Sequence, residues 1–446
     1  MPKPVYFSGG VHPHEGKAPT AAAPIAAAPL LPLYTVPFQQ HIGAPPKPVV
    51  AKGDRVLRGQ VLAEANGVVS APVHAPTSGV VKDIVDIASP MGRLGPSVLL
   101  EADGQDTPAE PLAPIAAWQE AAPEALRQRI AEAGIVGMGG AAFPAAVKLA
   151  PPPSKRIDTL ILNGVECEPC LTADHRLMLE APEPILTGAL IMARILGVKT
   201  ILVGIEQNKP DAIALLGAAA APLGIQVQGL RVRYPQGAEK QLIYALTGRK
   251  VPTGGLPMDV GVVVQNVGTS AAVVAAVREG TPLYERVTTI TGTPVASPGN
   301  WRLRVGTSYA KAIELAGGIT GDTAKVISGG PMMGFSVYDL ETPVMKNTSG
   351  ILLMAPSEVS QYQSHACIRC GRCIDACPMH IMAEALSVQI ENERYDLAER
   401  TRVLDCIECG CCAYACPAHR PLVQHMRRAK QEVLARRRAR EAQAKQ

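Results

Sequence analysis

The pattern of apolar and polar residues changes several times along the chain, and it is most regular between residues 118 and 285. Segments with helical periodicity, such as PEALRQRIAEAG at 123–134, alternate there with apolar runs such as IDTLILNGV at 157–165 and VKTILVGI at 198–205. Apolar runs without alternation are typical of strands that are buried on both faces. We therefore predict an α/β domain with a largely parallel sheet over residues 118–285.

The residues before this domain show two other patterns. Residues 1–40 are rich in Pro and Ala, which disfavours a continuous helix or a central strand, so we predict an extended arm that lies over a neighbouring domain or a partner. Residues 41–117 carry short Val-rich runs between Gly and Pro turns, which predicts an all-β domain. Its segments KGDRVLRGQ and APTSGVV resemble the two halves of a barrel-sandwich hybrid domain of the kind that carries biotin or lipoate. The expected hairpin tip, EANGVVSA, has no Lys, so we predict a structural role.

The residues after the α/β domain divide into three further regions. Residues 286–355 return to short β segments around one helix, SYAKAIELAGG, and predict a small β-grasp-like domain of the SLBB type. Residues 356–425 contain two cysteine runs separated by a stretch with the periodicity of two helices, so this domain should be mostly helical. Residues 426–446 predict a basic helix, which is either solvated or docked on anionic lipid or an acidic partner.

Composition narrows the functional classes. A net charge of +4 over 446 residues gives no footprint for nucleic acid. The N-terminus lacks the apolar core of a signal peptide, and the most apolar stretches are interrupted by Arg194 or by Gln265 and Asn266, so we expect a cytoplasmic chain without a transmembrane helix. Eleven cysteines in a reducing compartment indicate metal or redox chemistry rather than disulfides.

The cysteine spacing is the most specific signal in the sequence. CIRCGRCIDACP at 367–378 and CIECGCCAYACP at 406–417 both follow the pattern C-x2-C-x2-C-x3-C-P of two-cluster ferredoxins, in which the fourth Cys of each run binds the other cluster. Two zinc sites are the alternative, but zinc motifs rarely show the third x2 spacing and the closing C-P. We predict one 4Fe-4S cluster on Cys367, Cys370, Cys373 and Cys416, and a second on Cys406, Cys409, Cys412 and Cys377. Cys411 is off the spacing and is expected to pack beside a cluster.

Two clusters relay single electrons but do not provide a substrate, so a source of electrons is sought upstream. Glycines in GIVGMGGAAFPAAVKL precede a helix, where a backbone can approach a phosphate closely, although a tight structural turn explains them as well. The segment does not fit the dinucleotide fingerprint. Polar residues follow the predicted strand IDTLILN, where ligands of open α/β sheets bind, and these are Asn163, Glu166, Glu168 and Asp174. The segment YPQGAEKQLIYALTG carries Gly237, Glu239 and Lys240, and a later strand-to-helix turn carries Gln265, Asn266 and Thr269.

Together these segments resemble the flavin- and NADH-binding subunit of respiratory complex I over roughly residues 120 to 350. With the barrel-sandwich segment in front and the cysteine runs behind, the whole chain resembles the C subunits of Rnf (Rsx) ion-translocating electron-transport complexes. The segments GGVHPHEGK and NGVECEPCLTADHR are the most family-specific parts outside the cysteines.

The resemblance implies a set of cofactor contacts. Around FMN it implies that the phosphate and ribityl region is lined by Gly137, Gly139, Gly140 and Lys148. It implies that the flavin ring or the ribityl hydroxyls are contacted by Asn163 and Glu166, and that the phosphate end is contacted by Gln265, Asn266 and Thr269. On the NADH side it implies that Phe143 stacks on adenine, while Glu168 and Glu239, with Gly237 beside them, approach the nucleotide. The chain departs from complex I at Met138, where an Arg is usual, at Gln265, where an Asn is usual, and in lacking two further stacking aromatics.

The predicted function is an NAD-dependent oxidoreductase subunit that passes electrons between NADH, FMN and two 4Fe-4S clusters, with no catalytic acid–base residue of its own. The resemblance implies a ferredoxin-like partner subunit within a membrane complex and a peripheral location on the cytoplasmic side of the inner membrane. Two alternatives are a relay scaffold with a vestigial flavin pocket and a cobalamin- or quinone-linked reductase. Cys167 and Cys170 form a C-x2-C without a second ligand pair, so a metal there is not expected.

Overall fold

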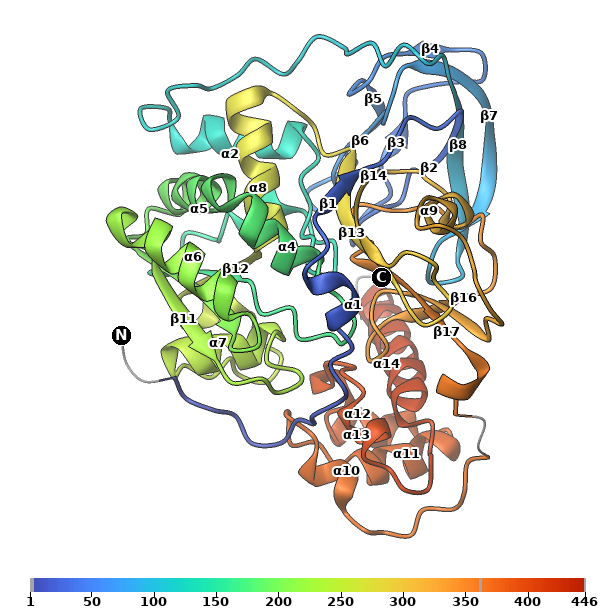
Figure 1. The fold of residues 1–446 in the computed structure, drawn as a ribbon. Coiled ribbons are helices and arrows are strands. Elements are labelled where there is room, and N and C mark those ends of the chain that lie inside the picture. The colour runs from blue at the N-terminus through green and yellow to red at the C-terminus, as the bar shows by residue number, and fades with distance from the viewer. Residues whose placement is uncertain (1–3, 361–362, 445–446) are drawn as a thin grey trace.

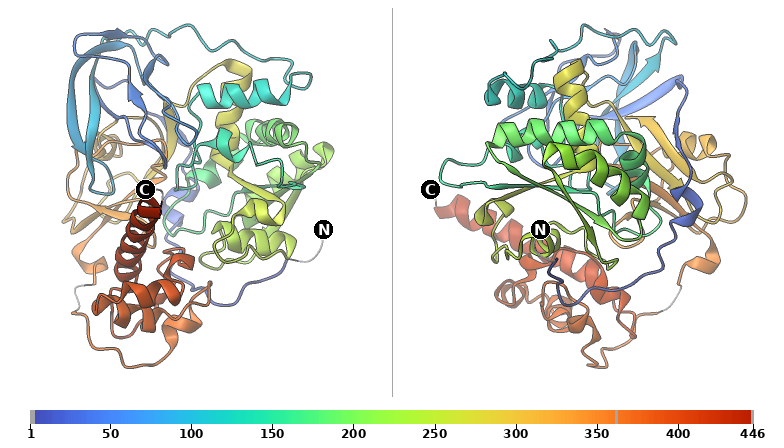
Figure 2. Two further views of the ribbon diagram at one scale, coloured as in Figure 1. Left: turned by 180° about the vertical axis from the view of Figure 1, so that it is seen from behind. Right: turned by 60° about the vertical axis from the view of Figure 1, so that its left-hand side comes forward.

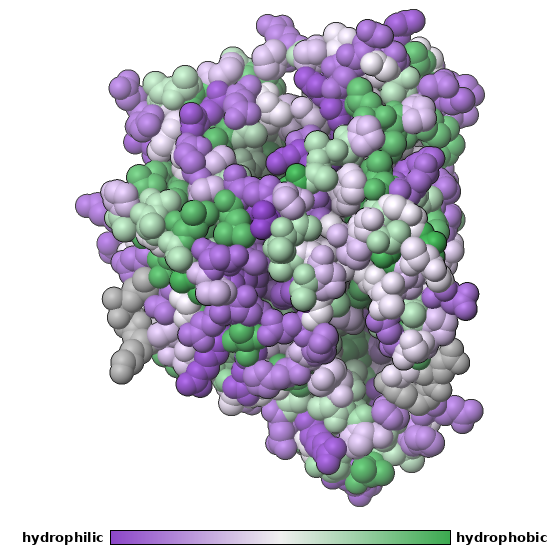
Figure 3. Space-filling view, viewed as in Figure 1, coloured by the Kyte–Doolittle hydropathy of each residue, from purple (hydrophilic) through white to green (hydrophobic). Residues whose placement is uncertain are grey.

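The computed structural model describes residues 4–360 and 363–444, and it confirms the predicted order of domains (Figure 1). An N-terminal β domain, an α/β domain and a second β domain lie against one another, and a small helical domain lies at one end. None of the described helices combines the length and the apolar character needed to cross a bilayer. Polar residues cover much of the face shown in Figure 3, with apolar residues in scattered groups.

The N-terminal β domain consists of two small antiparallel sheets. One sheet has the order β2-β8-β7-β4, formed by Leu33–Pro37, Leu94–Ala102, Gly79–Ala88 and Arg55–Val56, and the other has the order β3-β5-β6, formed by Lys47–Pro48, Val61–Glu64 and Val73–His74. Alternate residues such as Val36, Leu62 and Val98 point inward and form the core. Strand β2 lies within residues 1–40, so this segment is not wholly the arm that its Pro content indicates.

The α/β domain is built on four parallel strands in the order β11-β10-β9-β12, as the unbroken apolar runs predict. The strands are β9 (Thr159–Asn163), β10 (Thr200–Glu206), β11 (Gln226–Leu230) and β12 (Val262–Asn266). The helices are α2 (Pro123–Glu132), α3 (Ala145–Lys148), α4 (Ala173–Glu180), α5 (Pro182–Leu196), α6 (Pro210–Ala220), α7 (Glu239–Thr247) and α8 (Val267–Val274). The last residues of β9 and β12, Asn163 and Asn266, are paired in register, which brings the two polar loops that follow to one edge.

The second β domain is a sheet of six strands in the order β1-β14-β13-β17-β15-β16. Five strands come from the predicted SLBB region, and they are β13 (Glu285–Thr291), β14 (Gly299–Arg304), β15 (Lys325–Ser328), β16 (Phe335–Val337) and β17 (Gly350–Met354). Helix α9 (Tyr309–Leu315) packs on the sheet through Tyr309, Ala312 and Ile313. The sixth strand, β1 (Ile25–Ala27), comes from the N-terminal arm and lies parallel to β14 at the sheet edge.

The arm runs over this chain's own domains. Val5 donates a backbone hydrogen bond to Ala245 of the α/β domain, Gly10 donates one to Ala376 of the helical domain, and Val11 exchanges two with Tyr234. Helix α1 (Ala18–Ala21) and strand β1 then continue the arm across the molecule (Figure 1). Because the arm bonds to three domains in turn, it fixes their relative positions.

The helical domain carries the two cysteine runs. The two helices predicted between the runs are present as α11 (Ala383–Glu391) and α12 (Tyr395–Arg400), and short helices α10 (Arg372–Asp375) and α13 (Cys411–Tyr414) lie within the runs. The basic helix begins earlier than predicted, as α14 (Leu422–Ala444), and extends from the helical domain toward the β domains (Figure 2). Its residues Met426 and Val433 are buried, so the first half of this helix belongs to the domain core rather than to solvent.

Candidate functional site

The eight motif cysteines lie around two hollows in the helical domain, and the fourth cysteine of each run lies with the first three of the other. We call the first the inner hollow and the second the outer hollow. The inner hollow has an empty volume of about 360 Å³ and contains Cys377, Cys406, Cys409 and Cys412. The outer hollow has an empty volume of about 300 Å³ and contains Cys367, Cys370, Cys373 and Cys416. This is the crossed grouping that the spacing predicts for two clusters.

The two runs adopt the same local backbone. Arg369 and Glu408 follow the second residue of each run with positive φ angles of 54° and 57°, and their amides donate to the sulfurs of Cys367 and Cys406 at 3.4 and 3.3 Å. Each run then continues into a glycine with a positive φ. Amide donors to thiolate sulfur stabilise its negative charge and tune a bound cluster.

Burial of the thiols raises the pKa of Cys373 to about 11 and that of Cys406 to about 12. These thiols therefore keep their protons at neutral pH until a metal centre displaces them. Among the residues that the structure describes, no three His, Cys, Asp or Glu side chains converge as they would around a single metal ion. The cysteines surround open hollows, and four sulfurs around a hollow suit a cluster.

The inner hollow lies against the α/β domain. The Tyr234 hydroxyl donates to the Cys409 carbonyl at 2.8 Å, and Gln241 of α7 donates to the Pro378 carbonyl at 3.2 Å. Cys411 is fully buried beside this hollow, with its sulfur 3.9 Å from the Tyr234 carbonyl, so its predicted place next to a cluster site agrees with the structure. Tyr234 and Gln241 link the α/β domain to the inner hollow, and the sequence analysis identified neither.

The predicted flavin residues of the glycine loop and of β12 lie together. The Met138 amide donates to the Thr269 hydroxyl at 2.9 Å, and the Gly137 amide donates to the Phe143 carbonyl at 2.8 Å. A Cβ at Gly139 would lie 3.4 Å from Cβ of Asn266, so the glycine loop faces the start of α8 closely. The loop, the β12 end and Thr269 therefore form one wall of a site.

The residues after β9 complete this wall. The Asn163 amide group donates to the Gly237 carbonyl at 2.8 Å, and the Asn266 amide group donates to the Asp174 carboxylate at 2.7 Å. Glu166 accepts from the backbone amide of Asp174 at 2.7 Å. Burial, and then the neighbouring carboxylate of Glu166, raises the pKa of Asp174 above its ordinary value.

Lys148 and Glu239 are also brought together. The Lys148 ammonium lies 2.8 Å from the Glu239 carboxylate and 3.2 Å from the Val264 carbonyl on β12. Both side chains remain about one-third exposed. A cation at this edge of the sheet is available to a phosphate, and the carboxylate is available to a ribose hydroxyl.

Glu168 is not placed with the other predicted residues. Its carboxylate accepts from the backbone amides of Met332 and Met333 at 3.1 and 2.7 Å, in the second β domain. Burial raises the pKa of Glu168 to about 7. The positive φ angles of 46° at Glu166 and 69° at Cys170 turn the loop, so that Glu168 lies on the side of the inner hollow rather than with Glu239.

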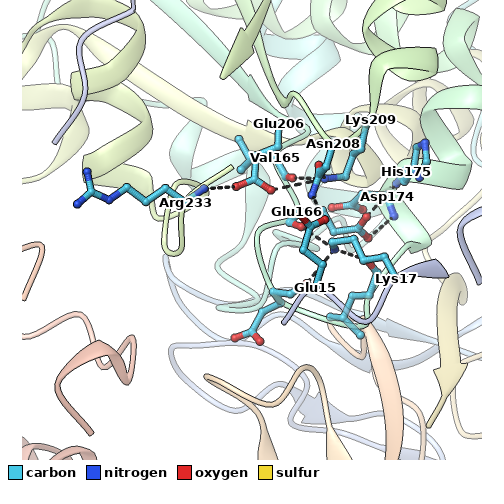
Figure 4. A network of polar contacts seen from close by, with 12 residues as sticks. Glu15, Lys17, Val165, Glu166, Asp174, His175, Glu206, Asn208, Lys209 and Arg233 are labelled. Atoms are coloured by element: carbon cyan, nitrogen blue, oxygen red, sulfur yellow. Dashed lines mark hydrogen bonds and ion pairs between the residues drawn. The ribbon is translucent and has the colours of Figure 1, made fainter. Parts of the chain in front are cut away.

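Two buried lysines shape this acidic loop, and the sequence analysis assigned neither of them (Figure 4). Lys17 of the arm donates to the carbonyls of Glu166 and Glu168 at 2.9 and 2.8 Å, and Lys209 donates to the Val165 carbonyl at 2.8 Å. The signal for Lys17 was its place in GGVHPHEGK, a segment that is family-specific but had no assigned role.

The residues present fit the phosphate end of a flavin. Among the described residues, the backbone amides of Gly139, Gly140 and Ala141 donate to no protein group, and Gly140 has a φ of 118° that only glycine adopts readily. The Gln265 side chain is 2% exposed, and its amide nitrogen has no partner. Free amides at a turn before a helix form a cradle for an anion.

Comparisons with known proteins find the same kinds of domain in the same order. Family models match as the RnfC barrel sandwich hybrid domain over residues 5–105, the Nuo51 FMN-binding domain over 130–275, the SLBB domain over 287–336 and the 4Fe-4S dicluster domain over 360–417. The predicted types of all four domains are thus confirmed.

Curated relatives match almost the whole chain. The C subunit of the proton-translocating ferredoxin:NAD(+) oxidoreductase complex of Clostridium ljungdahlii is 50% identical over 96% of this chain and 93% of its own. The C subunit of the Na(+)-translocating ferredoxin:NAD(+) oxidoreductase complex of Acetobacterium woodii is 43% identical over 97% and 98%. A solved structure of an NAD+-reducing [NiFe]-hydrogenase in the H2-reduced state has a TM-score of 0.49 at 19% identity, over 73% of this chain and 65% of that one. On the relatives' identity and coverage, this chain belongs to the family of C subunits of Rnf-type ion-translocating ferredoxin:NAD(+) oxidoreductase complexes.

Proposed function

We propose that this protein passes electrons between NAD(H), FMN and two 4Fe-4S clusters as a peripheral subunit of an ion-translocating ferredoxin:NAD(+) oxidoreductase complex. The observation that carries the proposal is that four cysteines surround each of two hollows, and that the inner one contacts the FMN-type domain through Tyr234 and Cys409. The names of the relatives supply the ion-translocating complex and its reaction. The location that we propose for it is the cytoplasmic side of the inner membrane.

The residues divide the work into binding and relay. Bound FMN supplies hydride acceptance from NADH and one-electron transfer to the clusters. The free amides of Gly139, Gly140 and Ala141 and the Lys148 ammonium would hold its phosphate, while Asn163, Asn266 and Gln265 offer amide groups to its polar atoms. Glu239 and Phe143 are the residues proposed for the nucleotide. The chain supplies no acid–base pair, because hydride transfer between cofactors requires none.

The eight cysteines are proposed as the cluster ligands in the crossed grouping. Tyr234 fixes the inner hollow to the α/β domain, and the arm residues Gly10 and Val11 bond on both sides of this contact. A cluster in the inner hollow would therefore be closer to the flavin loops than a cluster in the outer hollow. The outer hollow, with Cys370 exposed, is the proposed exit to a ferredoxin-like subunit.

An absorbance spectrum of the anaerobically purified protein, before and after NADH, tests the proposal. We expect about eight iron atoms per chain, one FMN, and bleaching of both chromophores by NADH. A protein with full iron content that retains no flavin and does not respond to NADH would contradict the proposed function and leave a relay scaffold.

A further inference from the structure

Three side chains of the SLBB region reach across to the glycine loop of the α/β domain. The Lys346 ammonium donates to the Gly134 carbonyl at 2.8 Å, and the Asn347 amide group donates to the Gly140 carbonyl at 2.9 Å. The Arg286 guanidinium lies 3.4 Å from the Met138 carbonyl and 3.0 Å from the Lys346 carbonyl. All three contacts are to carbonyl oxygens, so they act on the backbone conformation of the loop.

The two cations are buried to an unusual degree. Lys346 is 1% exposed and Arg286 is 3% exposed, and their hydrogen bonds within the described residues go to carbonyl oxygens rather than to a carboxylate. Burial lowers the pKa of Lys346 to about 7 and, against a smaller opposing effect of the Asp174 carboxylate, that of Arg286 to about 10. Two buried cations without a directly paired carboxylate are costly unless an anion binds nearby, and the glycine loop that they contact is the part of the site that fits a phosphate.

The geometry of the peptide bond explains how these contacts shape the loop. In a trans peptide plane the C=O and the following N–H point in opposite directions. Arg286, by holding the Met138 carbonyl, therefore also directs the Gly139 amide, and Asn347, by holding the Gly140 carbonyl, also directs the Ala141 amide. These are two of the amides that donate to no protein group in the described part of the chain.

We propose that Arg286, Lys346 and Asn347 are positioning residues that preset the glycine loop for the phosphate of FMN and make the site prefer FMN over riboflavin. The inference rests on the proposed flavin function and deepens it. Arg286 and Asn347 hold the Met138 and Gly140 carbonyls, so the free amides of Gly139 and Ala141 point to the other side of the loop. Lys346 holds the start of the loop at Gly134, and the two buried charges favour a phosphate dianion over a neutral hydroxyl.

The test compares two flavins that differ only in the phosphate. Flavin-depleted protein that retains its clusters is titrated anaerobically with FMN and with riboflavin, and binding is followed by flavin fluorescence. For Lys346→Met and Arg286→Met we expect the FMN dissociation constant to rise by roughly tenfold or more, the effect of losing one charged hydrogen bond, while riboflavin affinity changes far less. Asn347→Asp, at a partly exposed side chain, should also weaken FMN selectively because it adds a negative charge.

Arg304→Met is the matched control. Arg304, on β14 of the second β domain, joins that domain to the N-terminal β domain through Asp106 at 2.8 Å, and Asp106 keeps its contact to Thr77 in this variant. It contacts no glycine-loop residue, so both flavins should bind as they do to wild type. Iron content and thermal melting show which variants fold.

The outcomes separate this proposal from the proposed function. Equal loss of FMN and riboflavin affinity in the variants would show a purely structural role and overturn the proposal, and so would unchanged FMN affinity. If the lysine or arginine variants do not fold, Asn347→Asp decides between the same results. Wild type that binds neither flavin would overturn the flavin site itself, and this proposal with it.

Discussion

The two cysteine hollows have the same ligand spacing and the same local backbone, but they differ in their surroundings. The inner hollow is covered by Met379, Ile381, Val423 and Met426 and contacts the α/β domain. The outer hollow has Ile368 beside it, which is 67% exposed, and Cys370 is exposed. A repeated motif therefore specifies two similar sites, while the neighbouring domains determine that one is enclosed and the other faces outward.

The charges beside the two hollows differ as well. At equivalent positions the first run has Arg369 and the second has Glu408, and Glu408 is paired with Lys430 and with Arg427 of α14. The basic helix thus directs part of its charge to its own domain. Arg428 and Arg437 also pair, with Glu393 and Glu399, which leaves less of the helix charge for lipid or a partner than the sequence indicates.

The largest expected effect comes from replacing the fourth cysteine of either run with Ala. Cys377→Ala should remove the inner cluster and Cys416→Ala the outer one, because each lies in the hollow formed by the other run. Each variant should keep about four of about eight iron atoms. Paramagnetic resonance identifies the lost signal, and if Cys377→Ala lost the cluster held by Cys367, Cys370 and Cys373, the crossed assignment would be wrong.

Removal of the flavin should prevent NADH from reducing either cluster, while both clusters remain bound. Gly139→Val adds a branched side chain at a position where even a single added Cβ would lie 3.4 Å from Asn266, so FMN content should fall by more than about tenfold. Iron content should stay near wild type, and dithionite should still reduce both clusters. Gly95→Val, in β8 with no atom within 4 Å of the added Cβ, is the control and should keep its flavin. Full NADH reduction in the Gly139 variant would move the flavin site elsewhere.

The rates at which small reagents destroy the two clusters should also differ, but by a smaller factor. We expect ferricyanide or an iron chelator to destroy the outer cluster several-fold faster, since Cys370 is exposed whereas Cys377 and Cys409 are each 7% exposed. The decay of the two resonance signals measures this directly. Equal rates, or faster loss of the inner signal, would remove the distinction between a buried and an exposed cluster.

The smallest expected effect concerns the cluster potentials. The Lys430 ammonium donates to the Cys406 carbonyl at 3.0 Å, and a nearby cation stabilises the more negative, reduced cluster. Lys430→Met should therefore lower the inner potential by some tens of millivolts and leave the outer one in place. Lys311→Met, at an exposed side chain of α9, should change neither. Redox titration followed by paramagnetic resonance measures both potentials. A shift in the potential of the outer cluster instead would contradict the assignment.

The parts of the site that follow strands or repeat a motif could be predicted from the sequence. Asn163 and Asn266 end adjacent parallel strands, and parallel strands bring their carboxyl ends to one edge. The positions of Tyr234, Lys17 and Lys346 could not be predicted, because their partners lie 175, 151 and 212 residues away and no periodic pattern marks such contacts. The contact of the Glu168 carboxylate with the Met332 and Met333 amides could not be predicted, because a loop with positive φ angles at Glu166 and Cys170 carries no signal of direction. The Pro-rich arm was predicted to be extended, but its sequence does not show that it binds its own chain.

We propose that electrons from NADH reach the cluster in the inner hollow before they reach the one in the outer hollow. Rapid mixing of FMN-loaded Cys377→Ala and Cys416→Ala proteins with NADH, followed by freezing and paramagnetic resonance, measures this order. We expect the inner cluster of Cys416→Ala to be reduced at the wild-type rate, and the outer cluster of Cys377→Ala to be reduced far more slowly than in wild type. Reduction of the outer cluster at the wild-type rate in the Cys377→Ala protein would contradict it.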